Sequence, residues 1–233
     1  MSVDTKKLEA MVDNLVSSYL STVFDFRVLE PMLYRKDVID RHGRAERAPG
    51  FASIRFGLYY HLILECWKLA CDDDDRSYSV RRIRKAFNDT ATVSRLRHEY
   101  GNLQISIDQS VDPHTRAVFE QINQEDRAKR ESEFDTKLDE FRRLWDLFLS
   151  SPQYTTIDKA RKKVAAHSEV TQSAGGFRAK DLSDVGIKWG HERLFIEDLR
   201  EIVDLVNHLV RRAGLTWSQF DEQTKRDALN FWK

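Results

Sequence analysis

Residues 51–71 read FASIRFGLYYHLILECWKLAC, and this stretch decides the fold. Its apolar residues recur at helical spacing on nearly every side, and its charged or ionisable exceptions are Arg55, His61, Glu65 and Lys68. A helix that is apolar all round is buried among other elements, whereas a surface helix has one apolar stripe. The stretch therefore predicts a central helix with neighbours on several sides, as in a helical bundle.

Amphipathic helices are predicted before and after this stretch. From Asp4, a good N-cap, to about residue 30, apolar residues follow three- and four-residue steps, and Pro31 is expected to end that helix. Residues 31–50 read as irregular or only partly helical. After the acidic run at 72–75, short helices are expected behind Ser79 and Thr90.

The second half of the chain begins with a long charged helix. Asp112 and Pro113 form a good helix start, and no stop signal follows before residue 150. A straight helix of that length would span roughly 55 Å, so it either projects or breaks near its charged middle.

Three further segments follow the long helix. A helix restarts at residues 151–152 and ends near His167, and residues 168–180 are expected to be a loop. A strongly amphipathic helix covers about 190–213, with Gly214 as its expected stop, and a short amphipathic helix closes the chain.

Composition agrees with an all-α fold. Charged residues make up 33% and hydrophobic residues 41% of the 233 residues, with only 9 glycines and 4 prolines. No repeat or linker interrupts the pattern, so residues 1–233 read as one domain, an up-and-down helical bundle. Lys and Arg (38) balance Asp and Glu (38), so any nucleic-acid binding must come from local patches.

The compartment can be predicted from cysteine usage and hydropathy. Cys66 and Cys71 lie in one apolar run, and their spacing suits neither a disulfide framework nor a zinc knuckle. We expect ordinary buried thiols in a reducing compartment. The chain shows no signal-peptide core and no apolar run of about 18 residues, so we expect a cytoplasmic protein without membrane contact.

The stretch most suggestive of chemistry is DKARKKVAAH, residues 158–167. Arg161 can hold a phosphate through two parallel N–H bonds, and His167 can transfer a proton near neutral pH. Cleavage of RNA by its own 2′-OH needs both functions and no metal. Six residues on an α-helix separate two side chains by about 120° and roughly 9 Å, so a two-fold dimer would bring two copies of the pair together. The alternative is a solvated basic helix end with no chemistry.

This motif and its surroundings resemble the HEPN superfamily, with its R-x(4–6)-H motif, and in particular the abortive-infection Abi U branch. The similar parts are LYYHLILECWKLACDDDDRSYSVRRIRKAF, then a variable charged helix, then DKARKKVAAH, then RLFIEDLREIVDLVNHLV. The resemblance implies a helical bundle that dimerises around the motif. It implies a metal-independent endoribonuclease acting in phage defence or as a toxin, in which Arg161 binds the scissile phosphate and His167 transfers the proton.

The resemblance also leaves a second function open, because some HEPN proteins lack activity and serve as dimeric binding modules for a protein, RNA or nucleotide. Lys162 stands where active members often have Asn, Asp or His, which favours that alternative. On the enzyme interpretation Lys159, Lys162 and Lys163 would help to hold RNA, and an antitoxin or other protein partner is implied. No cofactor is expected.

A second basic patch follows the acidic run. Between residues 81 and 97 there are six basic residues and one acid, and Arg81, Arg82 and Arg84 are the candidate RNA-binding residues. The alternative is a solvated face that balances the aspartates at 72–75.

Two features could suggest a metal site. The aspartates at 72–75 lack the spacing of a calcium loop and read better as a helix-ending turn. His61 and Glu65 are one helical turn apart, and a metal-dependent hydrolase built on them is a weak third hypothesis, since a buried polar pair explains them better. We expect no metal.

Overall fold

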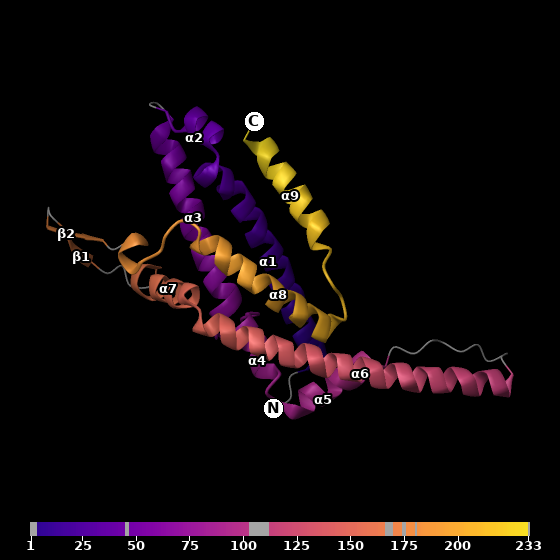
Figure 1. The fold of residues 1–233 in the computed structure, drawn as a ribbon. Coiled ribbons are helices and arrows are strands. Elements are labelled where there is room, and N and C mark those ends of the chain that lie inside the picture. The colour runs from indigo at the N-terminus through magenta and orange to yellow at the C-terminus, as the bar shows by residue number, and fades with distance from the viewer. Residues whose placement is uncertain are drawn as a thin grey trace.

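The structure is a computed structural model that describes residues 4–44, 47–102, 112–165, 170–173, 176–179 and 181–232. It confirms the predicted all-α class (Figure 1). In chain order the elements are α1 (Thr5–Tyr34), α2 (Lys36–His42), α3 (Ala48–Cys71), α4 (Val80–Ala86), α5 (Thr90–Gly101), α6 (Pro113–Ser150), α7 (Pro152–Ala160), the π-helical turn η1 (Arg161–Ala165), β1 (Val170–Ser173), β2 (Gly176–Ala179), the 3₁₀ turn η2 (Ser183–Val185), α8 (His191–Arg211) and α9 (Trp217–Phe231).

The core lies where α1, α3 and α8 pack together, with α6 crossing them and α9 lying against α1. Large side chains at its centre, such as Tyr19, Phe141 and Phe195, are fully buried. Tyr19 also donates a hydrogen bond of 2.8 Å to the carbonyl oxygen of Ile196, which ties α1 to α8. The buried residues follow the three- and four-residue steps expected of helices that share one core.

The helix α3 is only partly the buried central helix that the sequence predicts. Its C-terminal half is buried at Leu62, Cys66 and Leu69, but in its N-terminal half Ile54 is 55% exposed and Phe56 51% exposed. Fewer elements pack against that end of α3, so its apolar residues are not all buried even though they occur on every side of the helix. The N-terminal end of α3 therefore presents apolar side chains to solvent.

Two predicted boundaries are wrong, and one interval is more helical than predicted. Pro31 does not end α1, which continues to Tyr34 because Leu29 and Met32 on either side are fully buried. The interval 31–50 also contains α2 and the start of α3. Much of the predicted loop 168–180 is instead a two-stranded antiparallel hairpin. Strands of only four residues are too short to give a clear alternating pattern in the sequence.

Gly214 is not the stop of α8. The helix ends at Arg211, and Arg212 takes the left-handed conformation with a φ of 55°. Gly214 has a different role, because a Cβ there would come within 2.9 Å of the imidazole Nε2 of His208. Glycine is therefore needed at this position because the backbone passes close to the His208 ring, and not because it caps α8.

The long helix α6 is continuous and projects from the bundle (Figure 1). Its buried apolar residues all lie from Phe134 onward, among them Phe141, Trp145 and Phe148. Nearer its N-terminus Val118 and Ile122 are 46% and 41% exposed. Of the two outcomes left open for this helix, the structure shows projection.

Most of the predicted helix caps and the predicted state of the cysteines agree with the structure. Asp4 caps α1 as predicted, whereas Asp89 and not Thr90 caps α5. Cys66 and Cys71 are buried free thiols. No helix within the described ranges is long and apolar enough to cross a membrane.

Candidate functional site

Arg161, the predicted phosphate-binding residue, is the first residue of the π-helical turn η1. Its guanidinium carbon lies 4.4 Å from the centre of the Trp67 ring on α3, which is a close cation–π contact. Among the described residues no carboxylate forms an ion pair with Arg161. Its charge is therefore oriented by an aromatic face and is not neutralised there.

Trp67 is itself held in place by α7. The indole Nε1 donates a hydrogen bond of 3.2 Å to Asp158 Oδ1, and Lys162 Nζ donates one of 2.6 Å to Asp158 Oδ2. Asp158 thus orients the ring on which Arg161 lies. It also engages Lys162, one of the lysines predicted to contact RNA.

The same side of α7 receives a second arginine. Arg81, the second residue of α4, donates a hydrogen bond of 2.9 Å to the hydroxyl of Tyr154. Tyr154 lies one turn before Asp158 on α7, and Arg161 follows in the next turn as the first residue of η1. Two basic segments that lie far apart in the sequence therefore meet along one helix.

Burial shapes the ionisation at this place. The thiol of Cys71 lies against Arg81 and Tyr154, and burial raises its pKa to about 12. Burial likewise raises the pKa of Tyr154; the nearby Cys71 adds to this rise, and Arg81 partly opposes it. Both groups are neutral at physiological pH, so the charges of this region come from Arg81, Arg161 and the Asp158–Lys162 pair.

His167 lies outside the described residues, so its placement relative to Arg161 stays a prediction. The predicted angle between the two residues needs a correction, however. It assumed an α-helix, whereas residues 161–165 form a π-helical turn, which winds differently because its hydrogen bonds span one more residue. Such turns are frequent at functional sites. Lys159 and Lys163 are exposed beside it.

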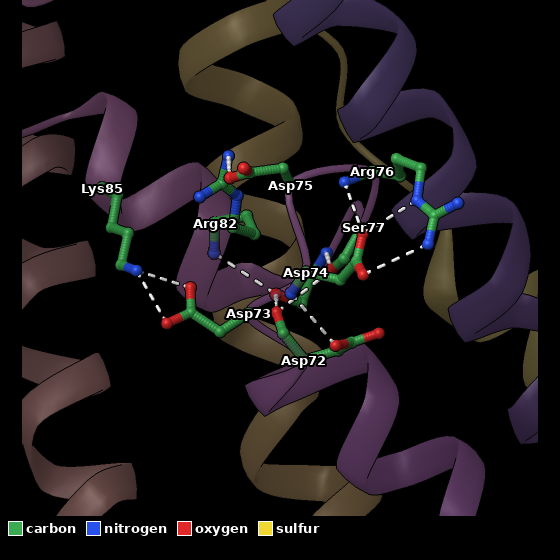
Figure 2. Close-up of polar contacts among 9 residues, drawn as sticks. Asp72, Asp73, Asp74, Asp75, Arg76, Ser77, Arg82 and Lys85 are labelled. Atoms are coloured by element: carbon green, nitrogen blue, oxygen red, sulfur yellow. Dashed lines mark hydrogen bonds and ion pairs between the residues drawn. The ribbon is translucent and has the colours of Figure 1, made fainter.

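The second basic patch is tied to the acidic loop at 72–75, as Figure 2 shows. Arg82 pairs with Asp75 at 2.9 Å, and Lys85 Nζ lies 2.5 Å and 2.7 Å from the two carboxylate oxygens of Asp73. Arg84 donates to the side-chain oxygen of Asn88 and keeps its charge. The loop is the predicted helix-ending turn, and it offsets part of the charge that we assigned to RNA binding.

The proposed pair of His61 and Glu65 is wrong. His61 Nε2 lies 3.6 Å from Asp25 Oδ2 with its side chain 52% exposed, and Glu65 binds Lys68 at 2.6 Å instead. Across the described part of the chain, no group of three or more His, Cys, Asp or Glu side chains is placed to hold a metal ion.

Sequence reasoning missed Trp67 and Asp158, which orient Arg161, and Tyr154, which holds Arg81. Trp67 was assigned to the core because of its helical spacing, and 94 positions separate it from Arg161. No local pattern links residues so far apart. Asp158 had a weak signal, since it lies three and four residues before Arg161 and Lys162, within reach on a helix.

Comparison with protein families gives one match, to the HEPN_AbiU2 family, described as AbiU2, over residues 5–231. Searches of curated proteins and of solved structures give no significant match. The match spans nearly the whole chain, including the motif and every described helix from α1 to α9. It agrees with the all-α bundle and with the motif from which the resemblance was inferred. The chain therefore belongs to the AbiU2 family of HEPN proteins, which places it in the abortive-infection class.

Proposed function

We propose that this protein is a metal-independent endoribonuclease in which residues 1–233 act as one domain, and that it serves in defence against phage or as a toxin. The observation that carries the proposal is the placement of Arg161 on the face of Trp67, with no carboxylate of the described residues paired to it. Family membership supports an HEPN-type activity.

In this mechanism Arg161 binds the non-bridging oxygens of the scissile phosphate. The attacking 2′-oxygen of the RNA loses its proton as it bonds to phosphorus, and the 5′-oxygen gains a proton as its bond to phosphorus breaks. His167 handles these protons, because imidazole can accept and donate near neutral pH. The products are a 2′,3′-cyclic phosphate and a 5′-hydroxyl, so neither water nor metal is needed in the step.

A composite site in a homodimer supplies two histidines, one to remove a proton and one to donate it. Two-fold symmetry also places two copies of Arg161 near one phosphate. This arrangement predicts a stable dimer at micromolar concentration, and a stable monomer measured by light scattering would contradict the composite site.

RNA would approach along α7. Tyr154, which holds Arg81, and Arg161 are seven residues apart, or roughly 10.5 Å along a helix. Arg81 and Arg161 are therefore suited to different phosphates of one strand. Lys159 and Lys163 add exposed charge beside them.

The test is cleavage of mixed cellular RNA in excess EDTA by wild type, Arg161→Ala and His167→Ala. Arg226→Ala, at an exposed arginine of α9, and His61→Ala serve as controls of the same residue types. We expect cleavage by wild type and both controls and its loss in both site variants. Loss in His61→Ala would instead favour a site around α3.

The alternative is an inactive HEPN dimer that binds a protein, RNA or nucleotide. The hydrogen bond from Lys162 to Asp158 favours it, since the lysine at the atypical position of the motif is already engaged. If folded, dimeric wild type cuts no RNA in this assay, the binding-module function replaces the nuclease.

A further inference from the structure

The exposed end of α3 borders a pocket of about 390 Å³ against the segment that leads into α8. Three aromatic side chains line it, namely Phe56 and Tyr59 from α3 and Trp189 from that segment. Phe56 and Trp189 are each 51% exposed, so both rings offer free surface to a ligand. A concave site lined by aromatic side chains and a few polar groups is typical of ligand-binding pockets.

The segment opposite α3 is fixed by its own structure. Leu182 and Ile187 both point inward and are 5% exposed, and the amide of Ile187 donates a hydrogen bond of 3.0 Å to the carbonyl of Leu182. Glycines with positive φ, Gly186 at 85° and Gly190 at 103°, permit the turns on either side of Trp189. The pocket is therefore formed before any ligand arrives.

Contacts across the pocket hold its two sides together. The hydroxyl of Tyr59 donates a hydrogen bond of 2.7 Å to the carbonyl of Lys188, and the Tyr59 and Trp189 rings meet edge to face at 4.3 Å. Burial, followed by the nearby Glu192, raises the pKa of Tyr59, so the hydroxyl stays a donor at physiological pH.

Cations lie beside these aromatic faces. The guanidinium of Arg55 is 5.9 Å from the centre of the Trp189 ring, and the exposed Lys188 lines the pocket. Within the described ranges neither forms an ion pair. Aromatic faces joined to unpaired cations are the combination that binds single-stranded nucleic acid, with the base on the ring and the phosphate on the cation.

The pocket also lies on the same side of α3 as the candidate site. Phe56 and Trp67 are 11 residues apart, which on an α-helix is about 16.5 Å and close to three full turns. Tyr60 stacks on Phe56 at 6.4 Å and continues the same face toward Trp67. A single strand with its phosphate at Arg161 could reach the pocket within a few nucleotides.

We propose that the pocket between Phe56 and Trp189 binds an unpaired base of the RNA, with Arg55 and Lys188 contacting the adjoining phosphates. This inference rests on the proposed function for its ligand, and it goes beyond it by assigning a base subsite away from the motif. An apolar side chain of a partner protein would fill the same volume, but it would bring no negative charge to Arg55 and Lys188.

The experiment compares binding of two labelled oligomers by fluorescence anisotropy in EDTA. One is a 2′-O-methyl oligoadenylate about eight nucleotides long, which cannot attack its own phosphates, and the other is an abasic oligomer of the same length and charge. The proteins are wild type, Phe56→Ala, Trp189→Ala and the control Phe24→Ala. Phe24 is an exposed phenylalanine of α1 that does not line the pocket.

Wild type and Phe24→Ala should bind the oligoadenylate about tenfold more tightly than the abasic oligomer, since base stacking on one aromatic contributes that much. Phe56→Ala and Trp189→Ala should lose most of this preference and keep wild-type affinity for the abasic oligomer. Thermal unfolding checks that both variants are folded. An unchanged preference in both variants, or no preference in wild type, overturns the inference.

The outcomes separate this inference from the proposed nuclease. RNA cleavage that depends on Arg161, together with an unchanged base preference in the pocket variants, rejects the base subsite alone. A base preference that both pocket variants lose, in a wild type that cuts no RNA, supports the subsite and rejects the nuclease.

Discussion

The guanidinium carbon of Arg161 lies 4.4 Å from the centre of the Trp67 ring, which joins the motif to the middle of the bundle. A long, flexible side chain is thereby restricted in a helix turn that winds differently from its neighbours. The contact orients the guanidinium without neutralising its charge, because the ring attracts the cation through its quadrupole and carries no negative charge of its own. Variants of Trp67 can therefore separate orientation of Arg161 from its charge.

Trp67→Phe keeps an aromatic face, whereas Trp67→Leu removes it. We expect Trp67→Leu to lower the RNA cleavage rate about fivefold, in proportion to a cation–π contact of roughly 1 kcal/mol, and Trp67→Phe to keep most of it. The measurement is the initial rate in EDTA, with thermal unfolding to show that both variants fold. Equal rates in the leucine variant and wild type would contradict the orienting role.

Asp158→Asn tests the carboxylate that engages Lys162. The amide oxygen can still accept from the Trp67 indole, but the negative charge is gone and the lysine is released. We expect RNA affinity to rise a few-fold, with a salt dependence steeper by about one phosphate contact. Stability should change by no more than about 1 kcal/mol, since the Lys162 side chain is 59% exposed.

The control for that experiment is Asp139→Asn, at a 76% exposed carboxylate on α6 that pairs with Arg142 away from the site. It removes the same charge and should leave the salt dependence unchanged. A fall in RNA affinity for Asp158→Asn would contradict this prediction. It would show that a charged acceptor is needed to orient Trp67, and that losing this orientation outweighs the release of Lys162.

Glu131 on α6 contributes acid-sensitive stability. Its carboxylate accepts hydrogen bonds from Arg127 at 2.8 Å and from Arg97 of α5 at 2.5 Å, and these bonds lower its pKa. A carboxyl that is more acidic in the folded state stabilises the fold above its unfolded pKa of about 4.3, and this stability is lost as pH falls through the folded pKa.

Glu131→Gln should therefore lower the melting temperature at neutral pH, and the difference from wild type should shrink toward about pH 3. Glu120→Gln, at an exposed position of the same helix, is the control and should follow wild type at both pH values. Differential scanning calorimetry measures both. A difference that stays constant with pH would indicate a packing effect instead.

Arg212 is strained at the end of α8. Its φ is 55°, and this left-handed region costs a residue with a Cβ about 1 kcal/mol or more. Its side chain donates a hydrogen bond of 2.8 Å to the carbonyl oxygen of Glu99. Arg212→Ala and Arg212→Gly both lose that bond, and only glycine also relieves the strain.

We expect the glycine variant to be more stable than the alanine variant by about 1 kcal/mol in urea unfolding. Because the lost hydrogen bond is common to both, the comparison isolates the backbone. Equal stabilities would mean that the helix end relaxes away from the left-handed conformation in the alanine variant.

The class and order of the helices could be predicted because periodicity is a local property. The steps along α1 and α8, and the start of α6 at Asp112, all follow from residues a few positions apart. The errors arose where a distant contact outweighed a local rule. Burial of Leu29 and Met32 keeps α1 helical through Pro31, and the room that His208 needs explains Gly214.

The candidate site could be predicted in part. The motif identified Arg161, and the charge pattern identified Arg81, whereas the contacts that bring them to one helix come from α3 and the middle of α7. The balancing role of the aspartates at 72–75 was one of two alternatives in the sequence, and distances to Arg82 and Lys85 were needed to weigh it. The role of His167 stays a prediction.

The projecting half of α6 affects how the protein diffuses. A helix of 38 residues is about 57 Å long, and its N-terminal half extends from the rest of a chain whose whole mass is only 27.4 kDa. Such a shape experiences more friction in water than a sphere of equal mass and tumbles more slowly about its short axes than about its long one. A single chain will therefore leave a sizing column earlier than a compact chain of the same mass.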